Sequence, residues 1–394
     1  MESPPLPALV SSIVSQSILL LLLLLFPSNP IPPLLLSSSH IAAAAATLLP
    51  SRRKRRRHTE EPSPDEQDSS PSISSIPPHP NPDHFSIHFG MKSSTFEWLV
   101  GLLDPLIDSR DPPGSPLRLP TTTRLALALS RLFGGAHYAD LAARFAVSQP
   151  AARFCARHLC RVLCTNYRFW LTFPSTPELL LPVAAGFSDL AGLPGCCGAV
   201  ASVRFHLRPG AAAAFLVADA SSKILSFTAV FPGDRSELEV LKLSSLFREA
   251  KEGRLLGQDQ YLVGDERHRL SPWLMVPFAD PVAGSGEEDF NVVLCRIRRP
   301  ARRAISSLLN WRVLNDLREE NTKAAMGFIA TCAILHNVLL MREDDSALAD
   351  IAEESLMSHA DHRHGEEEHS AEKKAILLRN TLALRARGLR GSYN

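Results

Sequence analysis

The stretch Gly195–Leu207, "GCCGAVASVRFHL", decides the fold class because its second half has the pattern of a buried strand. Three later runs share this pattern, namely "AAFLVAD" at 213–219, "KILSFTAVF" at 223–231 and "YLVGD" at 261–265. Short runs rich in apolar and β-branched residues, separated by Gly, Pro and Ser, are typical of strands. We therefore predict a sheet built between residues 198 and 265.

Helical patterns lie on both sides of these strands. Amphipathic segments precede them at 89–103 and 121–133, and an apolar helix follows at 322–341. We expect the helical pattern to resume at Pro300, which suits the first turn of a helix. On this prediction the acidic stretch "GSGEEDFN" at 284–291 is a loop. The fold class predicted is α/β, a mixed sheet flanked by helices and preceded by a helical domain.

Composition divides the chain into four parts: a Pro- and Ser-rich region at 1–85 that we interpret as mostly disordered, a helical domain at 86–182, the α/β domain at 183–342 and a charged helical tail at 343–394. The first part holds two competing targeting signals. Leu9–Phe26 is apolar enough for a signal sequence or membrane anchor, whereas Arg52–Arg57 is a run of six basic residues typical of nuclear localisation. We favour the nucleus and leave secretory or membrane targeting as the alternative.

The global charge and the cysteines exclude some classes of function. The net charge is +1, so binding to nucleic acid or membrane has to come from local patches. Seven cysteines do not indicate a disulfide framework in a chain of 394 residues. Cys155, Cys160 and Cys164 lie near His158, but at helical spacing they spread over more than one face and no second ligand pair follows. We interpret them as packed thiols rather than a zinc site.

The segment "YADLAARFAVSQPAARFCARHL" at 138–159 has the form of a helix-turn-helix. We predict a first helix ending at Phe145 and a second helix capped by Ser148. The polar face of the second helix would offer four side chains to DNA: Gln149, Arg153, Arg157 and Arg161. Two ordinary packed helices remain the alternative.

The order of several segments resembles the PIF/Harbinger transposases and the plant proteins domesticated from them, including the antagonist-of-like-heterochromatin group. The resemblance runs from about Phe89 to Met341. It is carried by "FSDLAGLPGCCGAVASVRF", "AVFPGDRSELEVLKLSSLF", "YLVGDERHRLSPWLMVPF" and the closing "ATCAILHNVLL", which contains the Leu-His-Asn signature of the family at 335–337. This resemblance implies an RNase H-like fold of the DDE type, with two aspartates and a glutamate that hold two divalent metal ions.

Carried onto this chain, the implied triad is incomplete. The first position is Ala201, the second is a retained aspartate, Asp265, and the third falls at or beside Arg302. His268 stands where the family usually has an aromatic residue, and an auxiliary His-Asp pair is replaced by Ser236 and Glu237. Asp219 and Glu237 are the candidate substitute carboxylates.

The leading hypothesis is therefore a catalytically inactive transposase derivative that binds DNA or nuclear proteins, such as a Myb-like or chromatin factor. We expect no cofactor in that case. The former catalytic site would present a phosphate-binding face or a merely solvated one, built from Arg296, Arg298, Arg299, Arg302 and Arg303. The alternative is an active nuclease that uses Mg²⁺ or Mn²⁺ through Asp265. A decaying gene copy or a membrane-anchored protein is a third hypothesis.

Overall fold

The computed structural model describes residues 82–107, 117–207, 210–231, 235–317, 320–349 and 372–390. The apolar run Leu9–Phe26 and the basic run Arg52–Arg57 lie outside these ranges, as does most of the acidic, histidine-rich part of the tail. The two targeting hypotheses therefore stay predictions.

Among the described residues, five strands form one mixed sheet in the order β3-β2-β1-β4-β5. The strands are β1 (Cys196–His206), β2 (Ala211–Ala218), β3 (Ile224–Val230), β4 (Tyr261–Val263) and β5 (Leu274–Met275). β1, β2 and β3 pair antiparallel, whereas β1–β4 and β4–β5 pair parallel. This is the predicted α/β class, and the four predicted strands are confirmed to within about two residues at each end. β5 was not predicted.

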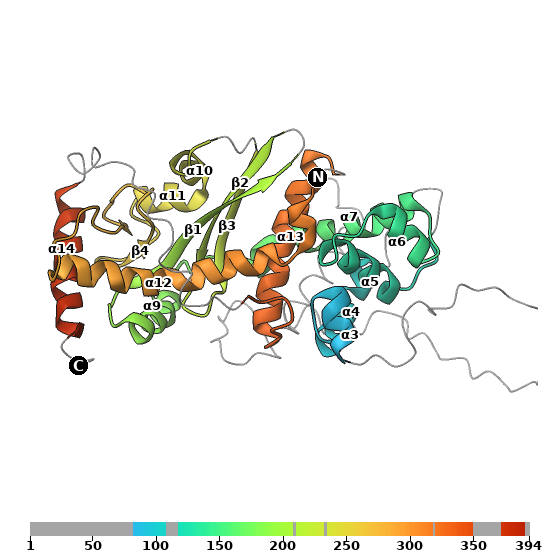
Figure 1. Ribbon diagram of the computed structural model, residues 1–394, viewed down its shortest axis with the longest axis horizontal. Coiled ribbons are helices and arrows are strands. Elements are labelled where there is room, and N and C mark those ends of the chain that lie inside the picture. The colour runs from blue at the N-terminus through green and yellow to red at the C-terminus, as the bar shows by residue number, and fades with distance from the viewer. Residues whose placement is uncertain are drawn as a thin grey trace, which may run out of the picture. The chain divides into compact units, whose positions relative to one another are not determined.

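The sheet separates two hydrophobic layers, because alternate residues of a strand point to opposite faces. Ala201, Leu216 and Val263 belong to the layer covered by α9 (Pro177–Ala191) and α12 (Gly286–Leu309). Val200, Phe215 and Leu262 belong to the opposite layer, with α10 (Glu237–Leu243) and α11 (Ser245–Lys251). Figure 1 shows α12 running along one side of the sheet and α10 and α11 on the other.

α12 corrects two predictions. The helix begins at Gly286, so Pro300 lies in its interior and not in its first turn. Ser285 caps the helix by accepting a hydrogen bond from the backbone N–H of Glu287, and the acidic residues expected to form a loop are its first turn. Negative charge there is stabilised by the positive end of the helix dipole. Pro300 therefore removes one hydrogen bond from inside a helix that is otherwise well capped and well buried.

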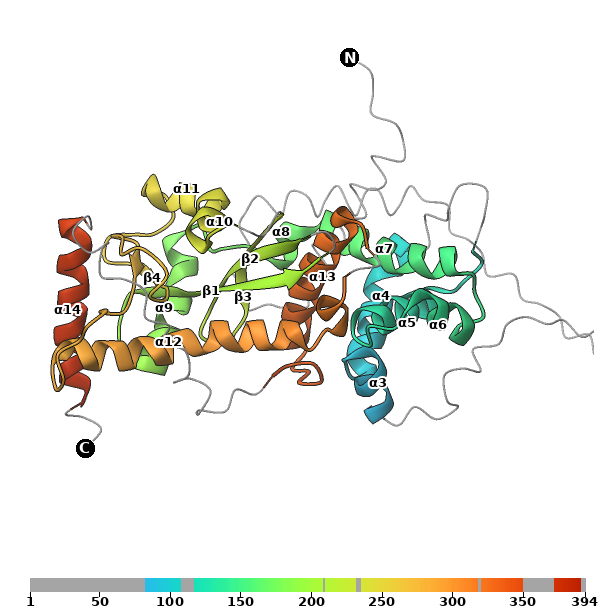
Figure 2. The ribbon, with the colours of Figure 1, turned by 45° about the horizontal axis from the view of Figure 1, so that its top comes forward.

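Two further helices complete the described C-terminal part. α13 (Thr322–Met341) packs against β3 and against α7 of the N-terminal helices. It is long and apolar enough to cross a membrane, but 67% of its apolar window is buried, which is typical of a core helix. α14 (Lys373–Arg390) packs on α12 (Figure 2), where a Cβ atom on Gly286 would lie 2.8 Å from the carbonyl oxygen of Ala383. Only glycine permits so close an approach.

The described chain before the sheet is helical. Besides α9, its elements are α3 (Pro82–Phe89), α4 (Ser93–Ile107), α5 (Thr121–Leu132), α6 (Tyr138–Arg144), α7 (Gln149–Thr165) and α8 (Tyr167–Trp170). Most of α5 is buried, and α7 lies between α5 and α13. A short 3₁₀ helix, η1 (Arg312–Asn315), connects α12 to α13.

Candidate functional site

Asp265 follows β4 and lies at the centre of a charged cluster. The residue is only 4% exposed. One carboxylate oxygen, Oδ1, accepts a hydrogen bond from the backbone N–H of Arg267 at 3.1 Å and lies 2.7 Å from Nδ1 of His268. The other, Oδ2, accepts from Nε and Nη2 of Arg267 at 3.2 and 2.7 Å, and Nη2 of Arg298 is 3.7 Å away. Both oxygens are therefore engaged by groups of the protein itself.

These partners determine the charge of Asp265. Burial alone would raise the pKa of the carboxyl group, because it disfavours the ionised form. The hydrogen bond to His268 and the charges of His268 and Arg267 outweigh burial and hold the pKa well below its ordinary value. Asp265 is therefore a carboxylate at neutral pH, stabilised by cations supplied by the chain.

Ala201 on β1 and Asp265 after β4 belong to neighbouring segments of the sheet. The parallel register pairs Ala199 with Val263, and Ala201 and Asp265 each come two residues further along their segments. Ala201 is buried in the layer that α12 covers. The first two positions of the implied triad thus lie on paired segments in the same direction from that register pair, but the first has no ligand atom.

The third position also lies at this site, and it carries positive charge. Arg298 is buried on α12 and reaches both Asp265 and Glu266, with its Nη1 3.4 Å from the Glu266 carboxylate. Arg302 lies one turn further along the same helix. Burial, followed by repulsion from Arg298, lowers the pKa of Arg302, while Asp265 and Glu266 act in the opposite direction. The guanidinium group of Arg298 therefore lies beside the retained aspartate where a metal site would need a carboxylate, and Arg302 interacts with the same aspartate electrostatically.

The five arginines predicted to form one face are divided by the fold. Arg303 turns away from Asp265 and donates a hydrogen bond to the carbonyl oxygen of Ala349. Arg296 is exposed, and Arg299 is half-buried. The arginines that approach Asp265 are Arg267, Arg298 and Arg302, of which only the last two belonged to the predicted set.

Neither candidate substitute is shown beside Asp265. Asp219 directly follows β2, opposite Gly198, which is three residues and about 10 Å along the sheet from Ala201. Its Oδ1 accepts hydrogen bonds from Ser221 and Lys223, so this carboxylate closes the β2–β3 turn. Glu237 is the first residue of α10, and its side chain lies outside the described part of the structure.

The donor set at Asp265 does not fit a pair of divalent cations. Within the described ranges no group of three or more His, Cys, Asp or Glu side chains could hold a metal ion. Hard cations such as Mg²⁺ need several oxygen ligands, and one engaged carboxylate does not supply them. A guanidinium 4 Å from a divalent ion adds about 2 kcal/mol of repulsion even at the dielectric constant of water.

A second candidate surface is the pair α6 and α7. Phe145 ends α6, and Ser148 caps α7 by accepting a hydrogen bond from the backbone N–H of Ala151 at 3.3 Å. Ala146 makes the turn with a φ of +51°, a left-handed conformation that glycine adopts more easily. Gln149, Arg153 and Arg161 are exposed on α7, and the Arg153 guanidinium lies 4.8 Å from the ring centre of Tyr138.

Arg157 departs from that exposed face. Its Nε and Nη2 donate hydrogen bonds to Oε2 of Glu320 at 3.1 and 2.9 Å. The Glu320 side chain is fully buried, and its other oxygen, Oε1, accepts a hydrogen bond from the Tyr138 hydroxyl and lies 3.7 Å from Arg131. We call these four residues the Glu320 clamp. The clamp joins α5, α6 and α7 to the segment that leads into α13.

The Glu320 clamp was not predicted from the sequence, although α5 carries a signal of it. Arg131 lies within the apolar run "RLALALSRLF" and is fully buried. A buried charge needs a partner, so an arginine inside an apolar helix predicts a carboxylate elsewhere in the chain. Which carboxylate that is cannot be inferred from local pattern, because Glu320 is far along the sequence.

The Leu-His-Asn signature at 335–337 is structural here. His336 is buried on α13, and its Nε2 donates a hydrogen bond to the carbonyl oxygen of Ser222 at 2.8 Å. Burial lowers the pKa of His336 to about 4, so the ring is neutral at pH 7 and cannot act as a charged ligand for phosphate. Asn337 bonds the backbone of Ile224 in edge strand β3.

The cysteines are free thiols, as expected. Burial raises the pKa of Cys160 on α7 well above its ordinary range. Burial also raises the pKa of Cys197, to about 12. Such thiols stay protonated and pack as apolar groups.

Comparison with known proteins adds to this geometry. Residues 210–337 match the family model described as DDE superfamily endonuclease. A protein of Arabidopsis thaliana named ALP1-like is 23% identical over 68% of this chain and 73% of its own length. Antagonist of Like Heterochromatin Protein 1, also of Arabidopsis thaliana, is 24% identical over 70% of this chain and 76% of its own. A human protein with the name "Putative nuclease HARBI1" is 23% identical over 64% and 76%. No solved structure matches the chain.

Proposed function

Because the chain is a Harbinger transposase-derived protein with a DDE endonuclease domain, we propose that it is a catalytically inactive derivative that binds DNA and proteins in the nucleus. The environment of Asp265 is the observation that supports the proposed loss of catalysis. This carboxylate is engaged by Arg267 and His268 and faced by Arg298 and Arg302, while Ala201 supplies no ligand. Fold and function separate here, since the scaffold of the site persists without its donors.

Cleavage of supercoiled plasmid by the full-length protein tests this proposal. With Mn²⁺ or Mg²⁺ present, we expect the wild type to nick DNA no faster than Asp265→Asn. Nicking by the wild type that the variant lacks would support the alternative, a divalent-metal-dependent nuclease. The name of the human relative makes that alternative worth the direct comparison.

Support for DNA binding comes from α7. Arg153 and Arg161 are exposed two turns apart on this helix, which follows a short turn and a serine cap. Each phosphate contact that is lost should reduce the salt dependence of binding by about 0.9 in the log–log slope. We expect the double variant Arg153→Ala, Arg161→Ala to bind duplex DNA more weakly, with a slope smaller by about 2. An unchanged slope would mean that α7 makes no phosphate contact.

Nuclear location is supported by the basic run Arg52–Arg57 in the sequence. A fluorescent fusion of the full chain, compared with one whose basic run is replaced by alanine, tests this part. We expect nuclear fluorescence that the replacement reduces. Fluorescence at membranes that disappears when Leu9–Phe26 is deleted would instead support an anchored protein.

A further inference from the structure

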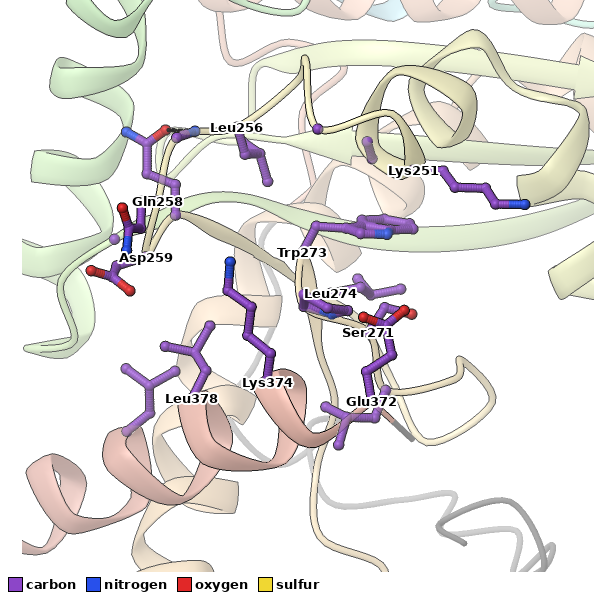
Figure 3. A pocket seen from close by; sticks show the side chains of 18 of the residues that line it. Lys251, Leu256, Gln258, Asp259, Ser271, Trp273, Leu274, Glu372, Lys374 and Leu378 are labelled. Atoms are coloured by element: carbon purple, nitrogen blue, oxygen red, sulfur yellow. Dashed lines mark hydrogen bonds between the residues drawn. The ribbon is translucent and has the colours of Figure 1, made fainter. Parts of the chain in front are cut away.

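A cavity of about 1150 Å³ lies away from both candidate sites, between α11, the loop from Gly253 to Gln260, the segment Arg269–Leu274 and α14. It opens at the start of β4, whereas Asp265 follows the end of that strand. Figure 3 shows Trp273 and Lys374 extending into this space from different walls, with Leu378 also on the α14 side. We call it the α14 pocket.

Apolar groups make up somewhat more than half of the exposed lining of the α14 pocket. Trp273 is half-buried and meets Phe247 edge to face, with ring centres 5.8 Å apart. Leu274, Leu378 and Leu382 line the space as well. Aromatic residues such as Trp273 and Phe247 are among the side chains enriched at the centre of protein interfaces.

α14 has a second apolar surface beside its packed one. Ala375, Leu382 and Ala386 are buried where α14 packs within the fold. Leu377, in contrast, lines the α14 pocket and is 69% exposed. An exposed leucine next to an aromatic wall is the kind of group that association with another chain would bury.

The charge of the pocket lining indicates which kind of ligand the α14 pocket favours. The pocket lining has two acidic residues, Asp259 and Glu372, and five basic residues: Lys242, Lys251, Arg269, Lys374 and Arg385. The lining is thus net +3 (5 − 2), although the whole chain has a net charge of only +1. An apolar floor with a basic rim complements a peptide that carries both acidic and large apolar side chains.

We propose that the α14 pocket binds an acidic peptide segment of a partner protein through apolar anchors. Trp273, Leu377 and Leu378 would contact the anchors, and Lys251 and Lys374 would pair with the carboxylates. The leucine-rich floor favours a peptide over single-stranded nucleic acid, which would need stacking faces and phosphate contacts along its whole length. This inference deepens the protein-binding part of the proposed function and depends neither on the loss of catalysis nor on DNA binding by α7.

Selection of random linear peptides displayed on phage against the full-length protein tests the inference. We expect recovered peptides to be enriched in Asp and Glu together with Leu, Phe or Trp. The affinity of a labelled recovered peptide, measured by fluorescence anisotropy, should fall about tenfold or more in Leu377→Ala and in Lys374→Glu. Because rim charges are screened by salt, the affinity should also fall as ionic strength rises.

Matched controls on the same molecule separate the pocket from general surface effects. Leu384 is 73% exposed on α14 but does not line the pocket, so Leu384→Ala should leave peptide affinity unchanged. Lys323→Glu reverses an exposed charge on α13 and should have no effect either. The DNA-binding variant Arg153→Ala, Arg161→Ala should bind the peptide as the wild type does, which distinguishes failure of this inference from failure of the proposed DNA binding.

Four results would overturn the inference. Recovered peptides could lack acidic enrichment, or Leu377→Ala and Leu384→Ala could weaken binding equally. Single-stranded DNA could compete with the peptide, and its own binding could be lost in Leu377→Ala and Lys374→Glu. That result would assign the pocket to nucleic acid. Sedimentation could also show a dimer that Leu377→Glu dissociates, which would assign it to a second copy of the chain.

Discussion

The side-chain amide of Asn337 pairs with both backbone groups of Ile224 in edge strand β3. Oδ1 of Asn337 accepts a hydrogen bond from the Ile224 N–H at 2.8 Å, and Nδ2 donates to the Ile224 carbonyl oxygen at the same distance. Nδ2 also donates to the carbonyl oxygen of Trp170 at 3.1 Å. One side chain of α13 thereby pairs with the outer edge of the sheet at Ile224, as a neighbouring strand would do.

Replacing Asn337 should therefore destabilise the fold without touching the candidate sites. We expect Asn337→Ala to lower the free energy of unfolding by about 3 kcal/mol, because it leaves buried backbone groups without partners. Asn337→Asp keeps an acceptor but loses both donated bonds, so it should also be destabilising. Chemical denaturation followed by circular dichroism measures both. Two variants as stable as the wild type would show that the edge of β3 is satisfied in another way.

His336 predicts how stability depends on pH. Its pKa is lowered by burial to about 4 in the folded protein, whereas in the unfolded chain it should lie near 6.5. The unfolded state therefore takes up a proton first as the pH falls, and stability is lost between about pH 6.5 and pH 4, by up to about 3 kcal/mol.

The variant His336→Gln isolates this contribution, because glutamine keeps a donor for the Ser222 carbonyl oxygen but does not titrate. Its unfolding free energy should fall less than that of the wild type between pH 6.5 and pH 4. Parallel curves for the two proteins would show that other groups cause the acid destabilisation.

The sequence predicts the sheet well, but not the way in which charged residues pair. Patterns of apolar residues predict four of the strands. β5 was not predicted because it has two residues, which is too short for a recognisable pattern. Pro300 suggested the start of a helix, yet the acids of Glu287–Asp289 and the Ser285 cap place that start earlier. Arg157 lay on the expected polar face of α7, but its partner Glu320 is brought to it by tertiary folding. For long-range pairs of this kind, the local pattern shows at most that a buried charge needs a partner, and not which residue supplies it.

Arg157 should contribute to stability rather than to DNA binding. We expect Arg157→Ala to lower the free energy of unfolding by about 2 kcal/mol, because buried Glu320 loses two charge-assisted hydrogen bonds and keeps Arg131 nearby. The salt dependence of DNA binding should remain that of the wild type. A double-mutant cycle with Glu320→Gln should show coupling between the two positions. Additive effects in that cycle would contradict the Glu320 clamp.

Asp265 should now be a stabilising residue. In a metal site, removing one of several clustered carboxylates relieves repulsion. Here removal leaves buried Arg298 without its counter-charge and His268 without its hydrogen-bond partner. We expect Asp265→Asn to destabilise the protein by about 3 kcal/mol. Glu266→Gln is the matched control: its carboxylate is 42% exposed and 3.4 Å from Arg298, so its loss should cost less than about 1 kcal/mol. Equal effects would show that Asp265 is not specifically paired.

The depressed pKa of Asp265 adds a second acid transition at lower pH. Ionised Asp265 stabilises the fold above its ordinary pKa, near 4, and this contribution disappears as the pH falls toward the lowered value in the folded protein. The stability of the double variant Asp265→Asn, His336→Gln should therefore vary less with pH in the acid range than that of the wild type or of either single variant. A double variant that loses stability as steeply as the wild type would contradict both assignments.

Calorimetric titration of Mn²⁺ into the full-length protein tests the central claim most directly, with Asp265→Asn and the rebuilt variant Ala201→Asp, Arg302→Glu measured alongside. We predict no saturable heat for the wild type or for Asp265→Asn, and measurable binding for the rebuilt variant, which carries a carboxylate at each of the three triad positions. Saturable binding by the wild type that Asp265→Asn abolishes would contradict the claim and show that this site still holds its metal.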